Sequence, residues 1–120
     1  MKQEFPYGFI IDYLSHLDIA VKPMFGCHGV YLGDVIYLFV RKRDKQKELN
    51  GVSIAVNKEY VKEMKKEFPF AEIGDNKNPW LFIGERSKRF EDYCIRFCEL
   101  ISKNDKRVGR NTKMKLRKIL

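Results

Sequence analysis

The fold of this chain is decided by residues Pro23 to Val40, which read PMFGCHGVYLGDVIYLFV. Within them, two runs rich in β-branched and aromatic residues, 30–32 and 35–40, flank Gly33-Asp34, a pair typical of two-residue hairpin turns. Pro23 fixes its own backbone and favours an extended residue before it, so a preceding helix should end earlier. The stretch therefore predicts a β-hairpin that follows a helix.

A two-residue turn at Gly33-Asp34 also predicts which residues of the hairpin share a face of the sheet. The expected pairs are Tyr31 with Ile36, Val30 with Tyr37, and His28 with Phe39. One face then carries Cys27, Tyr31, Ile36, Leu38 and Val40, and the other carries His28, Val30, Leu32, Tyr37 and Phe39. Both faces are apolar, so we expect helices to cover one of them and a second copy of the chain, or its C-terminal tail, to cover the other.

The rest of the chain alternates between helical and strand patterns. Apolar residues at helical spacing predict a helix that begins at Pro6 and ends near Asp18, a second at 58–68, and a third that Ser87 caps and that reaches Ile101. Short apolar or alternating runs predict three further strands, at 52–56, 70–73 and 80–83. The expected fold is α+β, a two-layer arrangement of a five-stranded antiparallel sheet with helices packed on it, in the order α-β-β-β-α-β-β-α.

Length and composition indicate a cytoplasmic protein. A chain of 120 residues can form a core without disulfides or metals. No apolar run reaches the roughly 18 residues that a membrane span needs, and the first residues lack the apolar centre of a signal peptide. The three cysteines are sparse and odd in number, which fits reduced thiols. We therefore expect cytoplasmic localisation and no membrane contact.

The positive charge is concentrated near the C-terminal end of the sequence. The net charge is +8, and eight Lys and Arg residues lie between 103 and 120, where Asp105 is the one carboxylate. We expect a folded domain over residues 1–103 and a basic tail over residues 104–120. Within the tail, apolar residues at helical spacing predict docking on an apolar surface; these are Leu116, Ile119 and Leu120.

The cysteine and histidine side chains are the candidates for metal binding or nucleophilic catalysis. Cys27, His28, Cys94 and Cys98 are ligands of the kind that zinc accepts. Cys94 and Cys98 nevertheless fall on the apolar stripe of the last predicted helix, where buried thiols are common. Cys27 and His28 are neighbours on a strand and point to opposite faces, so they cannot form a nucleophile–base pair. We expect no enzymatic activity, no catalytic residue and no cofactor.

Two other groups of side chains could contact nucleic acid. Five aromatic residues could stack on the bases of a single strand, although we favour a role in the sheet core; they are Tyr31, Tyr37, Phe39, Trp80 and Phe82. Basic residues of the exposed, mobile loop expected after Val40, and of the tail, could contact phosphates or an acidic partner. These are Arg41, Lys42, Arg43, Lys45, Lys47, Arg107, Arg110, Lys113, Lys115, Arg117 and Lys118.

The sequence also resembles a known family. Met24-Phe25-Gly26 followed by Gly29-Val30-Tyr31-Leu32 is similar to the signature of the TfoX N-terminal domain, found in the TfoX/Sxy competence regulators. Phe68-Pro69-Phe70 and Trp80-Leu81-Phe82 resemble later segments of that family. The resemblance implies the same α+β arrangement over roughly Phe9 to Ile101. Its motif residues here are Met24, Phe25, Gly26, Gly29 and Tyr31.

The resemblance sets the leading hypothesis for function. It implies a non-enzymatic regulatory or interaction domain, linked in that family to competence regulation, which would contact an unidentified protein partner and could associate with nucleic acid through its tail. One alternative is a direct, sequence-independent nucleic-acid-binding protein. Another is a small-ligand or zinc-binding module. A homodimer would also satisfy the expectation that a second copy covers the apolar hairpin face.

Overall fold

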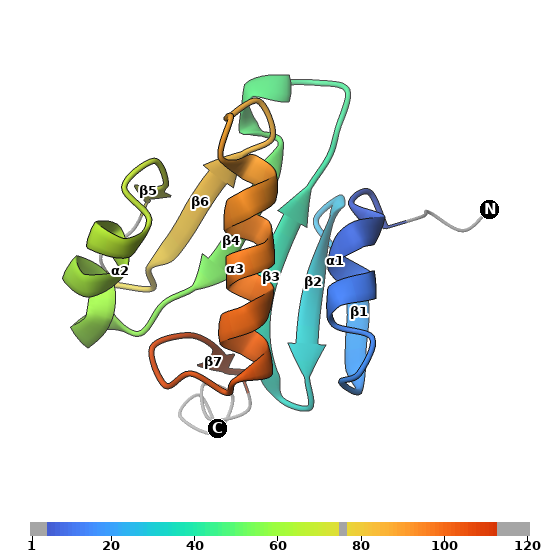
Figure 1. Ribbon diagram of the computed structural model, residues 1–120. Helices are drawn as coiled ribbons and strands as arrows, with labels where there is room; N and C mark the ends of the chain where they lie inside the picture. Colours follow the sequence, from blue (N-terminus) through green and yellow to red (C-terminus); the bar gives the residue numbers. More distant parts are fainter. Residues whose placement is uncertain (1–4, 75–76, 113–120) are drawn as a thin grey trace.

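The computed structural model describes residues 5–74 and 77–112, which form an antiparallel sheet with helices on one of its faces (Figure 1). This confirms the predicted two-layer α+β class. The helices are α1 (Gly8–Tyr13), α2 (Val61–Glu67) and α3 (Phe90–Ser102), with short 3-10 turns at Lys47–Leu49 and Lys58–Tyr60. The strands are β1 (Ile19–Met24), β2 (Cys27–Leu32), β3 (Val35–Arg41), β4 (Gly51–Ala55), β5 (Glu72–Ile73), β6 (Trp80–Gly84) and β7 (Arg110–Asn111).

The sheet formed by the described residues has seven strands, so the predicted number of five is wrong. Its order is β1-β2-β3-β4-β6-β5, and β7 pairs with β3. The two strands missing from the prediction, β1 and β7, precede and follow the predicted set. Strand β1 lies at one edge of the sheet, where the absent N–H of Pro23 breaks no pairing of the interior. The first helix accordingly ends at Tyr13, before the predicted Asp18.

Strands β1 and β2 are joined by a tight turn at Phe25-Gly26. Met24 pairs with Cys27, and both turn residues have positive φ, 51° at Phe25 and 77° at Gly26. Positive φ at both positions is characteristic of the type I′ hairpin turn, which normally takes Asn, Asp or Gly. The sequence therefore places an aromatic residue where its backbone conformation is unfavourable.

The predicted hairpin of β2 and β3 is present, but a β-bulge changes its register. Tyr31 pairs with Ile36 as expected, whereas Val30 pairs with Leu38 and His28 pairs with Val40. Tyr37 is the extra residue of the bulge, so every β3 residue after it is displaced by one position relative to the prediction. The predicted face assignment is therefore wrong beyond the bulge: Leu38 and Val40 lie on the face that carries Val30.

The face that carries Val30 and Leu38 packs against the helices. Strand residues there are mainly aliphatic and fully buried: Val30, Leu38, Val40, Val52, Ile54, Leu81 and Ile83. Helix α3 runs along this face, with α1 beside it (Figure 1). The predicted stripe of α3 is confirmed for Cys94, Phe97, Cys98 and Ile101, which are all buried. We call this surface of the sheet the helix face and the opposite surface the open face.

Part of the predicted tail belongs to the folded domain. Val108 is buried in the main core and bridges to Val56, and β7 pairs with β3 through Ile36 and Arg110. Residues 104–112 resembled a tail in the sequence because they are mostly polar or charged, and Val108 is the one large apolar residue among them. The rest of the predicted tail, with Lys113, Lys115, Arg117, Lys118 and the expected docking of Leu116, Ile119 and Leu120, lies outside the described residues.

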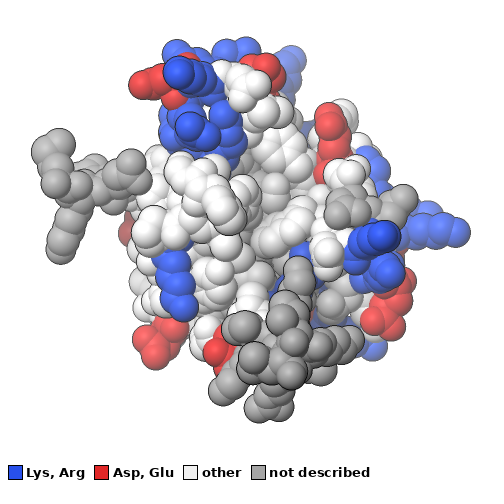
Figure 2. Space-filling view, turned by 180° about the vertical axis from the view of Figure 1, so that it is seen from behind, with Lys and Arg blue, Asp and Glu red and all other residues white. Residues whose placement is uncertain are grey.

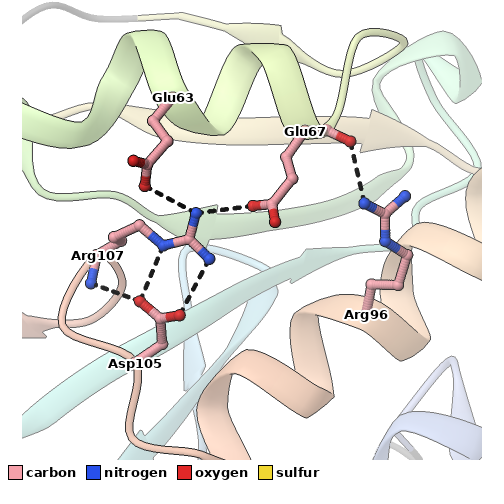
Figure 3. Close-up of polar contacts among 5 residues, drawn as sticks. All are labelled: Glu63, Glu67, Arg96, Asp105 and Arg107. Atoms are coloured by element: carbon pink, nitrogen blue, oxygen red, sulfur yellow. Dashed lines mark hydrogen bonds and ion pairs between the residues drawn. The ribbon is translucent and has the colours of Figure 1, made fainter.

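An ion cluster holds this returning segment on α2 (Figure 3). The Arg107 guanidinium donates to Asp105 at 3.0 Å, to Glu63 Oε2 at 2.9 Å and to Glu67 Oε2 at 2.8 Å. Arg96 of α3 donates to the backbone oxygen of Glu67 at 3.0 Å. The hydrogen bonds from Arg107 hold the pKa of the Asp105 carboxyl below its ordinary value. The cluster therefore ties α2, α3 and the segment before β7 together.

Candidate binding surface on the open face of the sheet

The open face of the sheet carries aromatic side chains, and the described helices all lie on the other side. Phe39 pairs with Ser53, which in turn pairs with Phe82, so these three side chains form one row across β3, β4 and β6. Ala55 pairs with Trp80 in the next row. Figure 2 shows this face: its centre is hollowed and uncharged, and Lys and Arg gather above it, over the loop between β3 and β4. The open face is therefore apolar with a charged margin.

Two adjoining hollows lie on the open face. The larger, about 410 Å³, lies between the β1–β2 turn and the sheet and is lined by Met24, Phe25, Ile36, Phe39, Ser53 and Trp80. The smaller, about 240 Å³, shares Phe39, Ser53 and Trp80 and extends to Arg41, Leu49, Gly51, Gly74 and Phe82. The rings of Phe39 and Trp80 stand 6.1 Å apart at 58° between the hollows. Among the described residues that line the two hollows, Ser53 supplies the one hydroxyl group.

Phe25 is the most exposed large apolar side chain among the described residues. It is 89% exposed, at the tip of the β1–β2 turn beside the larger hollow. Positive φ in a bulky residue is uncommon and costs roughly 1–3 kcal/mol. Because the phenyl ring stays almost fully in contact with water, it adds little buried apolar area to the folded domain. Neither the exposure nor the backbone conformation of Phe25 helps this domain to fold.

The family motif residues gather at this end of the open face. Met24, Gly29 and Tyr31 lie next to one another: a Cβ on Gly29 would meet Tyr31 Cε1 at 2.9 Å and Met24 Sδ at 3.4 Å. Phe25 and Gly26 form the turn that follows Met24. Glycine at 29 thus allows a close approach of side chains, while glycine at 26 allows positive φ. The motif builds the β1–β2 turn and the surface beside it.

The basic loop after β3 is exposed over residues 42–49, as expected, and it is hydrogen-bonded to its own backbone. Asn50 is buried; its Oδ1 accepts from the Arg43 backbone N–H at 2.9 Å and its Nδ2 donates to the Arg43 oxygen at 2.8 Å. The Arg41 guanidinium donates to Asn50 Oδ1 and to the backbone oxygens of Lys45 and Gln46. Arg41 and Asn50 therefore hold the loop in place. The Arg41 guanidinium uses its hydrogen bonds within the loop, although the sequence suggested it as a contact for phosphate or an acidic partner.

The other cations of this loop point to its surface. Lys42 forms an ion pair with Glu85 at 2.7 Å, and this contact lowers the pKa of the Glu85 carboxyl. The Arg43 guanidinium lies against the β1–β2 turn, with Cζ 3.5 Å from the position that a Cβ on Gly26 would occupy. Lys45 and Lys47 are exposed. The loop therefore presents three cations, from Arg43, Lys45 and Lys47, beside Phe25 and the hollows.

Two further cations lie over aromatic rings of the open face. Lys22 Nζ is 4.8 Å from the centroid of Tyr31, and Arg110 Cζ is 5.4 Å from the centroid of Trp80. Arg110 also donates to the backbone oxygens of Val56 and Pro79, at 3.0 and 2.9 Å. The Glu72 carboxylate shares the face at the β5 edge, where Glu72 pairs with Phe82. Cations therefore approach the apolar centre from several sides.

The five aromatic residues considered in the sequence separate between the two faces. Of these five, the main core includes Tyr37 alone, because the bulge turns its side chain toward the helix side. Phe39, Trp80 and Phe82 are half-buried on the open face, and Tyr31 is buried there beneath Lys22. Phe39, Trp80 and Phe82 therefore lie outside the main core, and their stacking on nucleic-acid bases stays a prediction.

The candidate zinc ligands are not brought together. Cys27 pairs with Met24 on the open face, whereas His28 lies on the helix face near the ring of Phe5. Cys94 and Cys98 are buried in α3, where burial raises the pKa of the Cys98 thiol to about 12 and that of Cys94 further. Among the described residues, no group of three or more His, Cys, Asp or Glu side chains could hold a metal ion.

Comparisons with family models, with curated proteins and with solved structures gave no match to this chain. The resemblance to the TfoX N-terminal domain therefore rests on the motif residues and stays a prediction. Over residues 5–74 and 77–112, no helix is both long and apolar enough to cross a membrane.

Proposed function

We propose that this chain is a non-enzymatic interaction domain and that the open face is its contact surface. Exposed Phe25 carries the proposal. An aromatic residue occupies a turn position that favours Asn or Gly, and its ring stands beside an apolar hollow. Local conflicts between sequence and structure that bring no packing gain are typical of functional sites. A partner that buried the ring would offset the conformational cost.

The character of the open face supports the same proposal. Contiguous apolar surface with a polar rim is typical of contact sites on proteins. Aromatic residues and Arg are the side chains that contribute most to binding interfaces, and this face combines Phe25, Phe39, Trp80 and Phe82 with Arg43 at its margin. The described titratable groups supply no nucleophile–base pair beside the hollows, so binding is the role that these side chains favour.

A regulatory role like that of the TfoX N-terminal domain is part of this proposal. Its support is the position of the motif: Met24, Phe25, Gly26, Gly29 and Tyr31 all lie at the end of the open face that carries the larger hollow. Phe25 and Gly26 of the motif are exposed for contact, and Gly29 and Tyr31 are packed beside the turn that presents them. We also propose cytoplasmic localisation, because the three sparse cysteines fit a reducing compartment.

Site-specific photocross-linking tests the contact surface. A benzophenone amino acid at position 25 should capture a binding partner in native cell extract, whereas the same amino acid at position 70 should not. Phe70 is the matched control because it is 61% exposed but lies by α3, where its N–H bonds to the Tyr93 hydroxyl. Equal yields at the two positions, or no product at position 25, would contradict the proposal. Nuclease treatment of the extract separates protein from nucleic-acid partners.

A further inference from the structure

We infer that the open face binds single-stranded nucleic acid, with bases stacked on its aromatic rings and phosphates held by the basic loop. The inference rests on the proposed function, because it names the ligand of the same surface. It narrows the stacking hypothesis drawn from the sequence to the rings that line the two hollows and adds Phe25, and it joins those rings to the cations of the basic loop.

The aromatic rings supply the first requirement, which is a set of accessible faces for bases. Phe39 and Phe82 stand on β3 and β6, two strands apart and therefore about 10 Å from each other. Trp80 lies between the two hollows, and Phe25 forms the outer wall of the larger one. A sheet whose exposed aromatics stack two or three bases is a recurrent way of binding single strands. Stacking tolerates any base because every base has a π-face.

The basic loop supplies the second requirement, which is charge at the margin of the stacking surface. Arg43 lies against the turn that carries Phe25, so a phosphate at Arg43 would be adjacent to a base at Phe25. Lys45 and Lys47 are exposed on the same loop, whose carboxylates are Asp44 and Glu48. Lys42 is not included among the phosphate-binding cations, because it forms an ion pair with Glu85. A strand could therefore run from the loop across Phe25 toward Trp80.

Charge complementarity favours this ligand over a second copy of the chain. Two copies that shared this apolar face would bring like-charged loops to its margins, since residues 41–50 carry five cations and two carboxylates. Single-stranded nucleic acid combines flat apolar groups with regularly spaced anions, and so matches both parts of the surface. A duplex keeps its bases stacked on each other and could not reach the hollows. The expected preference is therefore for single strands over duplex.

Trp80 provides a direct reporter, because it is the single tryptophan of the chain and lines both hollows. We expect saturable quenching of its fluorescence when the full chain is titrated with a 12-mer of deoxythymidine or uridine. Affinity should fall as salt rises; with about three phosphates neutralised, the slope of log K against log salt should be near −2. The 12-mer annealed to its complement should bind at least tenfold more weakly.

Two substitutions assign the parts of the surface, each with a matched control. Phe25→Ser should weaken binding of the 12-mer at least tenfold by removing one stacking partner, and Phe70→Ser should leave it unchanged. Arg43→Gln should weaken binding a few-fold and reduce the salt slope by about 0.7, while Lys62→Gln on the exposed side of α2 should do neither. Melting curves establish that both open-face variants are folded, and Phe25→Ser should melt no lower than the unmodified chain.

Three results would overturn the inference. The first is unchanged Trp80 fluorescence at all oligonucleotide concentrations; the second is binding that Phe25→Ser and Phe70→Ser affect equally. The third is a dimer in sedimentation that Phe25→Ser dissociates, which would assign the face to a second copy. Nuclease-insensitive cross-links to a protein at position 25, without oligonucleotide binding, would leave the contact surface standing and exclude nucleic acid as its ligand. Absence of both would contradict the proposed function itself.

Discussion

The two faces of the sheet are both apolar but differ in the kind of apolar residue that they carry. The helix face is aliphatic, and Leu38, Val52 and Ile54 are fully buried on it. The open face is aromatic, with Phe39 and Trp80 half-buried. Branched aliphatic side chains interdigitate with helix side chains to high density, whereas flat rings present faces that a ligand can use. An apolar pattern therefore does not by itself show that a strand is buried on both sides.

Neighbouring residues of β3 offer the sharpest comparison of the two faces. Leu38→Ala should lower the free energy of unfolding by about 2–5 kcal/mol, because it leaves a cavity beneath the helices. Phe39→Ala, one residue further on and on the open face, should cost about 1 kcal/mol despite removing a larger side chain. Urea unfolding of the two variants measures both values. Equal losses would mean that the open face is packed as tightly as the helix face.

Gly29→Val tests how rigid the open face is. A Cβ at position 29 would lie 2.9 Å from Tyr31 Cε1 and 3.3 Å from Ile36 Cδ1, so both neighbours must move. We expect a loss of about 1–3 kcal/mol from overpacking, measured as a lower melting temperature. Gly8→Val, where nothing lies within 4 Å, is the steric control. An unchanged melting temperature for the position 29 variant would indicate that this side of the sheet adapts freely.

The ion cluster on the helix side should make that side sensitive to acid. Arg107→Ala should cost about 1–2 kcal/mol, because it leaves Asp105 without its charged donor. The pKa of Asp105 is depressed below 3.8 in the folded protein, so its contribution is complete above that pH and disappears as the pH falls through the lowered value. Chemical unfolding between about pH 5 and pH 2 should therefore show a shallower acid loss in Arg107→Ala.

The matched control for this measurement is the more exposed pair of Arg96 and Asp92, whose charged atoms are 3.7 Å apart. Asp92→Asn should change the unfolding free energy by less than about 0.5 kcal/mol. If both variants changed the loss of unfolding free energy at low pH by the same amount, general surface charge would explain the effect and the cluster would have no special role.

Phe25→Asn should give a smaller effect than the other open-face substitution at Gly29, and of the opposite sign. Asn adopts positive φ more readily than Phe, so the variant should be more stable by about 0.5–1 kcal/mol. The same change should weaken binding at the open face. Differential scanning calorimetry checks the first expectation and the Trp80 titration the second. A destabilised variant would show that the Phe25 ring supports the fold, which would contradict its assignment as a contact residue.

Much of the sheet could be predicted because the apolar patterns of its central strands can be recognised in the local sequence. Alternation in 52–56 and the aromatic run after Pro79 gave β4 and β6, and the apolar stripe from Cys94 to Ile101 gave α3. Strand β1 escaped prediction because an edge strand needs no apolar alternation; most of its residues are exposed. Strand β7 has two residues and no pattern to detect. Their pairing is set by tertiary contacts.

The candidate site could be predicted only in part, for a similar reason. The sequence provided the aromatic residues, the motif and the basic loop. Which ring faced which side depended on the bulge at Tyr37, and no turn signal indicates that extra residue. The role of Asn50 was also hidden: Asn50-Gly51 is a common loop ending, yet here the Asn side chain is buried between Arg41 and Arg43. Position on a face depends on contacts between distant residues.

The pairing of β7 with β3 also affects how the chain folds during synthesis. Thr112 donates to the backbone oxygen of Asp34, 78 residues earlier, next to the β7 pairing partner Val35. At about 5–20 residues per second, a ribosome needs roughly 4 to 16 seconds to make the intervening chain. During that interval, the backbone groups of Val35 and Ile36 on that side of β3 lack their strand partner. Unpaired strand edges are sites of intermolecular association, so this part of the β3 edge stays open to such contacts until β7 has been made.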